Sequence, residues 1–253
     1  MKLSVLGDSY STFEGLSNNV IDPAEESKLF NYYPWGDVGA VSDTWWAKVC
    51  EKLGGTMVSN DSIAGTCVAD YNITPESRHE SGKWCMNQPK RICDLGDSDV
   101  SSPNHPDIIM VFGGTNDMCR EQFGIDKTEA QIKEATDLFV NTYSNVIRQI
   151  FERYSSSTTI LCITPCHSSL VGGNERALNA ICGGIGVVVE HYRQYGYDCK
   201  LVNTQEVDLT QGMEGKNKEE NKKDYSDGHP NALGMSAIAA RVIDVQLHEY
   251  QPQ

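Results

Sequence analysis

The sequence predicts an α/β fold with a mainly parallel sheet, because short apolar segments alternate along the chain with longer segments of helical periodicity. Each short segment is partly β-branched, as is typical of a strand that helices cover on both faces. The five predicted strands are residues 2–7, 56–60, 107–113, 158–164 and 199–204. With 253 residues, the chain is long enough for one large domain, and nothing in it requires a second.

Four further segments place apolar residues at helical spacing, and they are residues 42–55, 128–154, 174–196 and 231–247. The pair Ser42–Asp43 is expected to cap the first of these helices, and a capping box of Thr128 and Gln131 is expected to start the second. The pair Gly183–Gly184 lowers the helix propensity of the third. We therefore expect close packing against a neighbouring element at these glycines.

Two long stretches interrupt the alternation, residues 13–43 and residues 66–104. Loops of this length in a compact domain are usually functional or disordered, and the aromatic residues of 13–43 favour an ordered structure. We expect both to be insertions near the carboxyl ends of the first two strands, where open α/β sheets bind ligands. The alternative is surface decoration that does not contact a substrate.

Composition excludes several classes of function. The net charge of -14 argues against a nucleic-acid or anionic-membrane partner, because both need a basic surface. No segment has the roughly 18 apolar residues of a membrane-spanning helix. The first strand begins almost at Met1 and leaves no room for a signal peptide, so a cytoplasmic location is expected if Met1 is the native start.

The nine cysteines are expected to be reduced and mostly buried, because the number is odd and several lie in apolar segments. The segment "CITPCH" at residues 162–167 matches no common zinc-binding spacing, and no second Cys or His pair completes four ligands. The sequence therefore predicts no metal site.

The segment "SVLGDSYST" at residues 4–12 ends the first strand abruptly at Gly7, Asp8 and Ser9. Ser9 could simply cap the next helix, or the turn could present its hydroxyl to a substrate. A serine hydrolase also needs a histidine base, a group that orients this base, and donors for an oxyanion. Among the six histidines, His229 lies just before the last predicted helix, with Asp227 two residues upstream.

Donors for an oxyanion are suggested at two positions. Asn116 follows the third strand in "FGGTND", and its amide could point at an oxyanion. Gly65 follows the second strand in "NDSIAGTC", where a backbone N–H could approach a substrate without hindrance from a side chain. Each turn alone is ordinary, but all four segments in this order favour a hydrolase.

With "GDSYS", the lone Gly65, "GGTND" and "DGHPN" in this order, the chain resembles the SGNH (GDSL-type) hydrolase superfamily over residues 4 to about 245. The resemblance implies one SGNH-hydrolase-like domain over residues 1–253, with a flavodoxin-like three-layer α/β/α fold. It implies Ser9 as the nucleophile, His229 as the base, and an oxyanion hole made of Ser9 N–H, Gly65 N–H and the Asn116 side chain. It further implies carboxylic ester substrates and no metal or organic cofactor.

The chain departs from the superfamily's pattern at the acid that orients the histidine, the third member of the catalytic triad. The superfamily places this acid three residues before the histidine, where this chain has Ser226. Either Asp227 reaches the imidazole from a tighter turn, or Ser9 and His229 act as a dyad. Asp224 is a third candidate. We expect Asp227 to take the role.

Three functions are compatible with these residues. The first is hydrolysis of short-chain acyl esters, such as those of acetylated carbohydrates, through an acyl-serine intermediate. The second is acyl transfer, or hydrolysis of lipids or thioesters, at the same site. The third is a non-catalytic glycan-binding module, which would not need a serine, an asparagine and a histidine in this combination. The expected partner is a small-molecule or glycan ester.

Overall fold

The computed structural model describes residues 1–17, 31–71, 85–168, 174–207, 209 and 228–248. Its five strands form one sheet in which every neighbouring pair is parallel. The strands are β1 (Lys2–Gly7), β2 (Thr56–Ser62), β3 (Ile108–Phe112), β4 (Thr159–Ile163) and β5 (Cys199–Val202), in the order β2-β1-β3-β4-β5. This order is that of flavodoxin-like folds, so the predicted fold class is confirmed.

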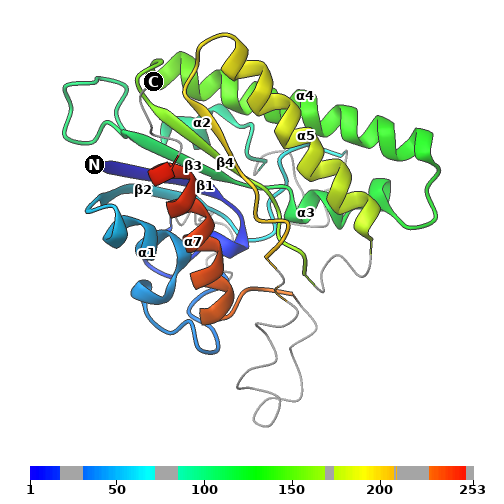
Figure 1. Ribbon diagram of the computed structural model, residues 1–253, viewed down its shortest axis with the longest axis horizontal. Helices are drawn as coiled ribbons and strands as arrows, with labels where there is room; N and C mark the ends of the chain where they lie inside the picture. Colours follow the sequence, from blue (N-terminus) through cyan, green and yellow to red (C-terminus); the bar gives the residue numbers. More distant parts are fainter. Residues whose placement is uncertain (18–30, 72–84, 169–173, 208, 210–227, 249–253) are drawn as a thin grey trace, which may run out of the picture.

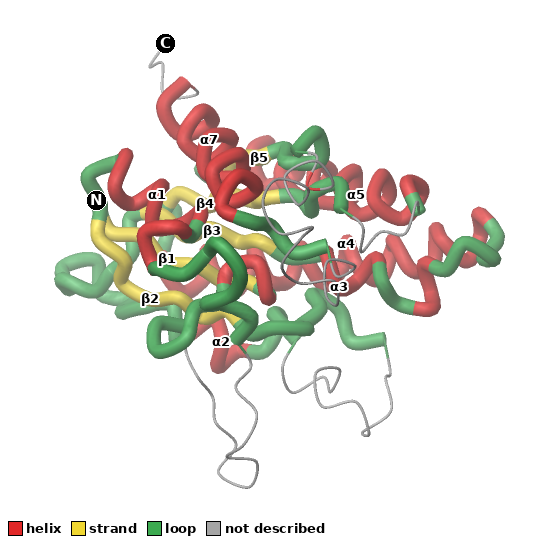
Figure 2. Tube along the Cα trace, turned by 90° about the horizontal axis from the view of Figure 1, so that it is seen from below, coloured by secondary structure: helices red, strands yellow, loops and turns green. Residues whose placement is uncertain are grey.

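Helices cover both faces of the sheet (Figure 1). One face carries α1 (Trp45–Lys52) and α7 (Ala232–His248), which pack against each other (Figure 2). The other carries α4 (Glu129–Tyr154) and α5 (Glu175–Gln194), with the short α2 (Pro89–Cys93) packed on α4. The result is the predicted three-layer α/β/α arrangement.

The central strand β3 shows how the sheet separates two cores. Ile108, Met110 and Phe112 pack with α1 and α7, whereas Ile109 and Val111 pack with α4 and α5. All five side chains are buried. This alternation follows from the period of two in a strand, and it explains why the segment is apolar throughout.

The helix boundaries follow local chemistry. The capping box of Thr128 and Gln131 starts α4 as predicted. The predicted cap of α1 is wrong, because Val41–Asp43 form a separate 3-10 turn and the Thr44 side chain accepts from the Ala47 N–H. Close packing is confirmed at Gly184, where a Cβ would lie 2.8 Å from Val140 Cγ2, but not at Gly183, which is open.

Two short helices lie where the sequence predicts none. They are α2, inside the stretch 66–104, and α3 (Thr115–Met118), directly after β3. The parts of the two insertions at residues 18–30 and 72–84 lie outside the described residues. A single domain over 1–253 with insertions at about 13–43 and 66–104 therefore stays a prediction.

All nine cysteines lie within the described ranges and none forms a disulfide, and seven are buried, whereas Cys93 and Cys119 are exposed. Among the helices that the structure describes, none has the length and apolar character needed to cross a membrane.

Candidate active site

The strand β1 ends in a tight turn that carries Ser9. Gly7 is the last residue of the strand, and a Cβ there would lie 2.7 Å from the side chains of Ser11 and Ser62. Ser9–Ser11 form a 3-10 turn that Asp8 caps, because its Oδ1 accepts from the Tyr10 N–H at 3.0 Å. The close contacts at Gly7 explain why the strand stops at a glycine and presents Ser9 at the edge of the sheet.

His229 meets Ser9 at this edge. The distance between His229 Nε2 and Ser9 Oγ is 2.7 Å, although the two residues are 220 positions apart. The Tyr10 hydroxyl donates to the Gly228 carbonyl at 2.8 Å, and the Tyr33 hydroxyl donates to the Pro230 carbonyl at 2.6 Å. The backbone on both sides of His229 is therefore bound to the rest of the site.

The two expected donors of an oxyanion hole lie on neighbouring segments. Gly65 has a φ of +77°, a conformation that favours glycine. The Asn116 side-chain amide donates to the carbonyl of Thr66 at 2.9 Å. The sequence predicts Asn116 in the turn after the third strand, and the structure places it after β3, which ends at Phe112, within the short helix α3. The short helix α3 is therefore the element that holds Asn116 against the loop of Gly65.

A buried arginine from α2 joins the turn of Ser9 to this loop. Arg91 is 4% exposed and donates to Asp61 Oδ2 at 2.8 Å. Its other nitrogens donate to the carbonyl of Gly7 at 3.1 Å and to Thr66 Oγ1 at 3.4 Å. A buried pair of this kind is costly to break, by about 3–5 kcal/mol, because the remaining charge stays uncompensated. Arg91 therefore fixes the spacing between β1 and the loop after β2.

Two buried carboxyl groups support the same turns. Asp117 accepts from the N–H groups of Val68 and Ala69, at 2.9 and 3.0 Å, and from the Tyr71 hydroxyl at 3.0 Å. Burial raises the pKa of Asp117 to about 6. Burial also raises the pKa of Asp8 to about 7, and the neighbouring charge of Asp117 adds to this effect, while the Tyr10 N–H opposes it. In both residues the carboxyl group accepts from backbone N–H groups, as is typical of aspartates that cap turns.

Aromatic side chains from the stretch 13–43 lie around His229. The rings of Tyr32 and His229 are stacked, with their centroids 3.6 Å apart and their planes at 5°. Trp35 lies at the edge of Tyr32 and is 45% exposed. The sequence indicates only that this segment is rich in aromatic residues, and it contains no signal for a contact with His229. Arg91 has no sequence signal either.

Asp227, the expected acid of the triad, and its alternative Asp224 lie outside the described residues. Of the remaining predicted site residues, the structure brings Ser9 to His229 and Asn116 to the loop of Gly65.

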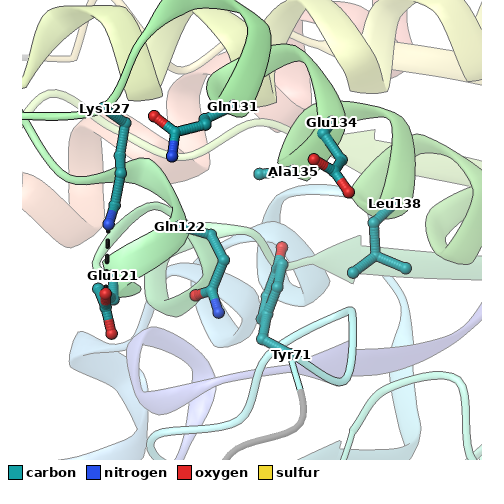
Figure 3. Close-up of a pocket in the computed structure, with 8 residues that line it drawn as sticks. All are labelled: Tyr71, Glu121, Gln122, Lys127, Gln131, Glu134, Ala135 and Leu138. Atoms are coloured by element: carbon teal, nitrogen blue, oxygen red, sulfur yellow. Dashed lines mark hydrogen bonds and ion pairs between the residues drawn. The ribbon is translucent and has the colours of Figure 1, made fainter.

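A separate pocket of about 480 Å³ lies between the 3-10 turn Glu121–Phe123 and the first turns of α4 (Figure 3). Its lining residues are Tyr71, Glu121, Gln122, Lys127, Gln131, Glu134, Ala135 and Leu138. Lys127 and Glu121 form an ion pair at 3.2 Å on one side of it. The lining contains no serine and no histidine, so the pocket lacks the pair of side chains that meets at Ser9 and His229.

A family model of GDSL-like lipases and acylhydrolases matches residues 1–194, which is more than half of the chain. The chain belongs to the GDSL-like lipase/acylhydrolase family. Membership of this GDSL-like family implies that the protein hydrolyses esters or transfers acyl groups. A search of curated proteins finds no match.

Solved structures similar to this GDSL-like protein span several activities. A protein from Bacteroides uniformis described as a GDSL-like lipase is 23% identical, with a TM-score of 0.61, and the match covers 95% of this chain and 92% of that one. A carbohydrate esterase family 2 enzyme from Corynascus thermopiles is 16% identical, with a TM-score of 0.58 and coverage of 96% and 64%. A salicylyl-acyltransferase from a tetracycline biosynthetic pathway is 17% identical, with a TM-score of 0.55 and coverage of 97% and 53%. Because all three identities are below 25%, these similarities concern the fold of this GDSL-like protein.

Proposed function

We propose that the protein is a serine esterase that removes short acyl groups, such as acetyl, from carbohydrate esters. The observation that carries the proposal is the 2.7 Å contact between Ser9 Oγ and His229 Nε2. At this distance an imidazole can take the hydroxyl proton directly. Ser9 is the nucleophile in this proposal, His229 is the base, and Asp227 orients the base.

The proposed reaction has two similar halves. As Ser9 Oγ bonds to the ester carbonyl carbon, its proton moves to His229 Nε2 and the carbonyl oxygen becomes an oxyanion. The N–H groups of Ser9 and Gly65 and the side chain of Asn116 donate to this oxyanion. The C–O bond to the alcohol then breaks, and the imidazolium gives its proton to the leaving oxygen. Water releases the acyl group from Ser9 by the same steps.

The contact of Asn116 with Thr66 is compatible with this role. A side-chain amide has two N–H donors. The hydrogen bond to the Thr66 carbonyl uses one of them and fixes the plane of the amide. The second hydrogen is then available for an oxyanion, and the amide does not have to reorganise when this charge develops.

The aromatic group beside His229 supports an alcohol with an extended apolar face, such as a sugar ring. Trp35 is 45% exposed, lies at the edge of Tyr32, and so offers an open indole close to the proposed base. Tyrosine and tryptophan rings can bury a large apolar area of a ligand, and their O–H and N–H groups can form hydrogen bonds at the edge of the ring. One solved structure with a similar fold is described as a carbohydrate esterase.

Acyl transfer to a second hydroxyl would use the same residues, and a solved structure described as an acyltransferase has a similar fold. The two reactions differ in the fate of the acyl group, which becomes a free acid in hydrolysis and an ester of the acceptor in transfer.

Covalent labelling tests the proposal. A fluorophosphonate probe should react at Ser9, and Ser9→Ala should abolish both labelling and hydrolysis of acetylated sugars and short aryl esters. The matched control is Ser156→Ala, because Ser156 is exposed in the turn before β4. Hydrolysis of these esters without labelling at Ser9 would refute the assigned nucleophile. The absence of both hydrolysis and labelling would favour a non-catalytic binding module.

A further inference from the structure

The ring of Tyr32 lies flat against the ring of His229, with centroids 3.6 Å apart and an angle of 5° between the planes. The ring of Tyr10 meets the same imidazole at a steep angle of 64°, with centroids 5.3 Å apart. Tyr10 is buried, whereas Tyr32 is half-buried. His229 therefore has one face covered by a tyrosine ring, while its Nε2 points at Ser9.

Tyr32 is bound to the turn of Ser9 through its backbone. Its N–H group donates to Thr12 Oγ1 at 2.8 Å, and this hydroxyl donates to the Ser9 carbonyl at 2.9 Å. One threonine therefore joins the backbone of the nucleophile to the backbone of the stacked tyrosine. Both distances lie within the ordinary range for hydrogen bonds, so a substantial shift of Tyr32 relative to Ser9 would break at least one of them.

The segment that carries Tyr32 is also bound to the segment that carries His229. The Tyr33 hydroxyl donates to the Pro230 carbonyl at 2.6 Å. The carboxylate of Asp37 accepts from the N–H of Ala232, at the start of α7, at 3.0 Å. The stack is thus held on both of its sides by hydrogen bonds and does not depend on ring contact alone.

We propose that Tyr32 is a positioning residue for His229. The tyrosine ring holds the plane of the imidazole in place, with Nε2 toward Ser9, and it stabilises the imidazolium. This inference rests on the proposed function of the Ser9 site. When the proton of Ser9 Oγ moves to His229 Nε2, the ring becomes a cation that lies over the negative face of the Tyr32 ring. The stabilisation disappears when the imidazolium gives its proton to the leaving oxygen. Tyr32 acts through the His229 ring and exchanges no proton itself, so the stretch 13–43 acquires a role in catalysis that is separate from substrate selection.

Two variants of Tyr32 separate the ring from the hydroxyl. Tyr32→Phe keeps the ring, so its kcat/KM on a short aryl ester should stay within about twofold of the wild type, whereas Tyr32→Leu should lower it by about 3- to 30-fold. The rate constant of fluorophosphonate labelling should fall by the same factor, because this small probe reports the reactivity of Ser9 and makes no sugar contact. The matched control is Tyr195→Leu, since Tyr195 is 71% exposed beside His191 on the far end of α5.

Labelling of Tyr32→Leu at the wild-type rate would overturn the proposal and would make Tyr32 a substrate contact. An equal loss in Tyr32→Phe and Tyr32→Leu would also overturn it, because the hydroxyl and not the ring would then matter.

Nuclear magnetic resonance tests the stack without catalysis. In the wild type, the ring protons of His229 should be shifted upfield by the Tyr32 ring and should show cross-relaxation with its protons. Tyr32→Leu should remove both effects and Tyr32→Phe should keep them. If the protein hydrolyses no ester, the proposed function fails while these signals still decide whether the stack exists. Absence of the cross-relaxation in the wild type refutes the stack even if Tyr32→Leu does not fold.

Discussion

Replacing Asp8 with asparagine should make the free energy of unfolding less sensitive to pH. The Asp8 side chain is fully buried, and its Oδ1 accepts from the Tyr10 N–H. A hydrogen bond from the Thr115 side chain and the charge of Arg91 also favour the ionised form, but burial outweighs all of these effects. The ionised form is therefore poorly solvated in the folded protein, and burial raises the pKa of Asp8 from 3.8 to about 7. Asparagine keeps the acceptor for Tyr10 and cannot ionise.

The size of the effect follows from the difference between these two pKa values. A difference of roughly 3 units corresponds to about 4 kcal/mol, at about 1.4 kcal/mol for each unit. Between about pH 4 and about pH 7, the folded protein keeps a proton that the unfolded chain releases, so the free energy of unfolding falls as the pH rises. The contribution of Asp8 is complete below about pH 4 and is lost as the pH passes about 7.

Urea unfolding at several pH values measures this difference. The free energy of unfolding of Asp8→Asn minus that of the wild type should increase by up to about 4 kcal/mol from pH 4 to pH 8. Asp99→Asn is the control, because Asp99 is exposed and a hydrogen bond from the Ser101 N–H lowers its pKa, so it titrates below this window. A difference between Asp8→Asn and the wild type that does not change with pH would refute the reasoning.

Two further predictions concern the proposed catalytic groups. Asn116→Ala should lower kcat on a short-chain ester by roughly 10²–10³ with little change in KM, because its amide stabilises charge that exists only in the transition state; a wild-type kcat would mean that the amide does not face the reacting carbonyl. Asp227→Asn should lower kcat by a factor of up to ~10⁴ if Asp227 orients His229, and by less than about tenfold if Ser9 and His229 act as a dyad. A greater loss in Asp224→Asn would make Asp224 the acid.

The architecture could be predicted because it depends on local patterns. The central strands β3 and β4 are nearly continuous apolar runs, since helices cover both faces of the sheet, and each long helix shows one apolar face. The edge strand β2 ends instead in polar residues, Ser59 to Ser62. The short helices α2 and α3 are too brief for such a pattern, and their positions depend on the contacts of Arg91 and Asp117 with distant segments.

The site could be predicted in part for the same reason. Ser9 and His229 each lie at a recognisable boundary, one at the end of the first strand and one before the last helix. Their contact follows from the topology, because the carboxyl ends of parallel strands share one edge of the sheet. The stack of Tyr32 on His229 joins two irregular segments, so it depends on tertiary packing that no periodicity encodes.

The 220 positions between Ser9 and His229 have a consequence for the newly made protein. Synthesis at about 5–20 residues per second separates the two side chains by roughly 10 to 45 seconds. During that interval Ser9 lacks its proposed base, and β1 lacks its neighbouring strands β2 and β3, which come later in the chain. A nascent chain would therefore be inert toward esters until α7 has docked beside α1, and reaction with a fluorophosphonate would report the completion of folding as well as activity.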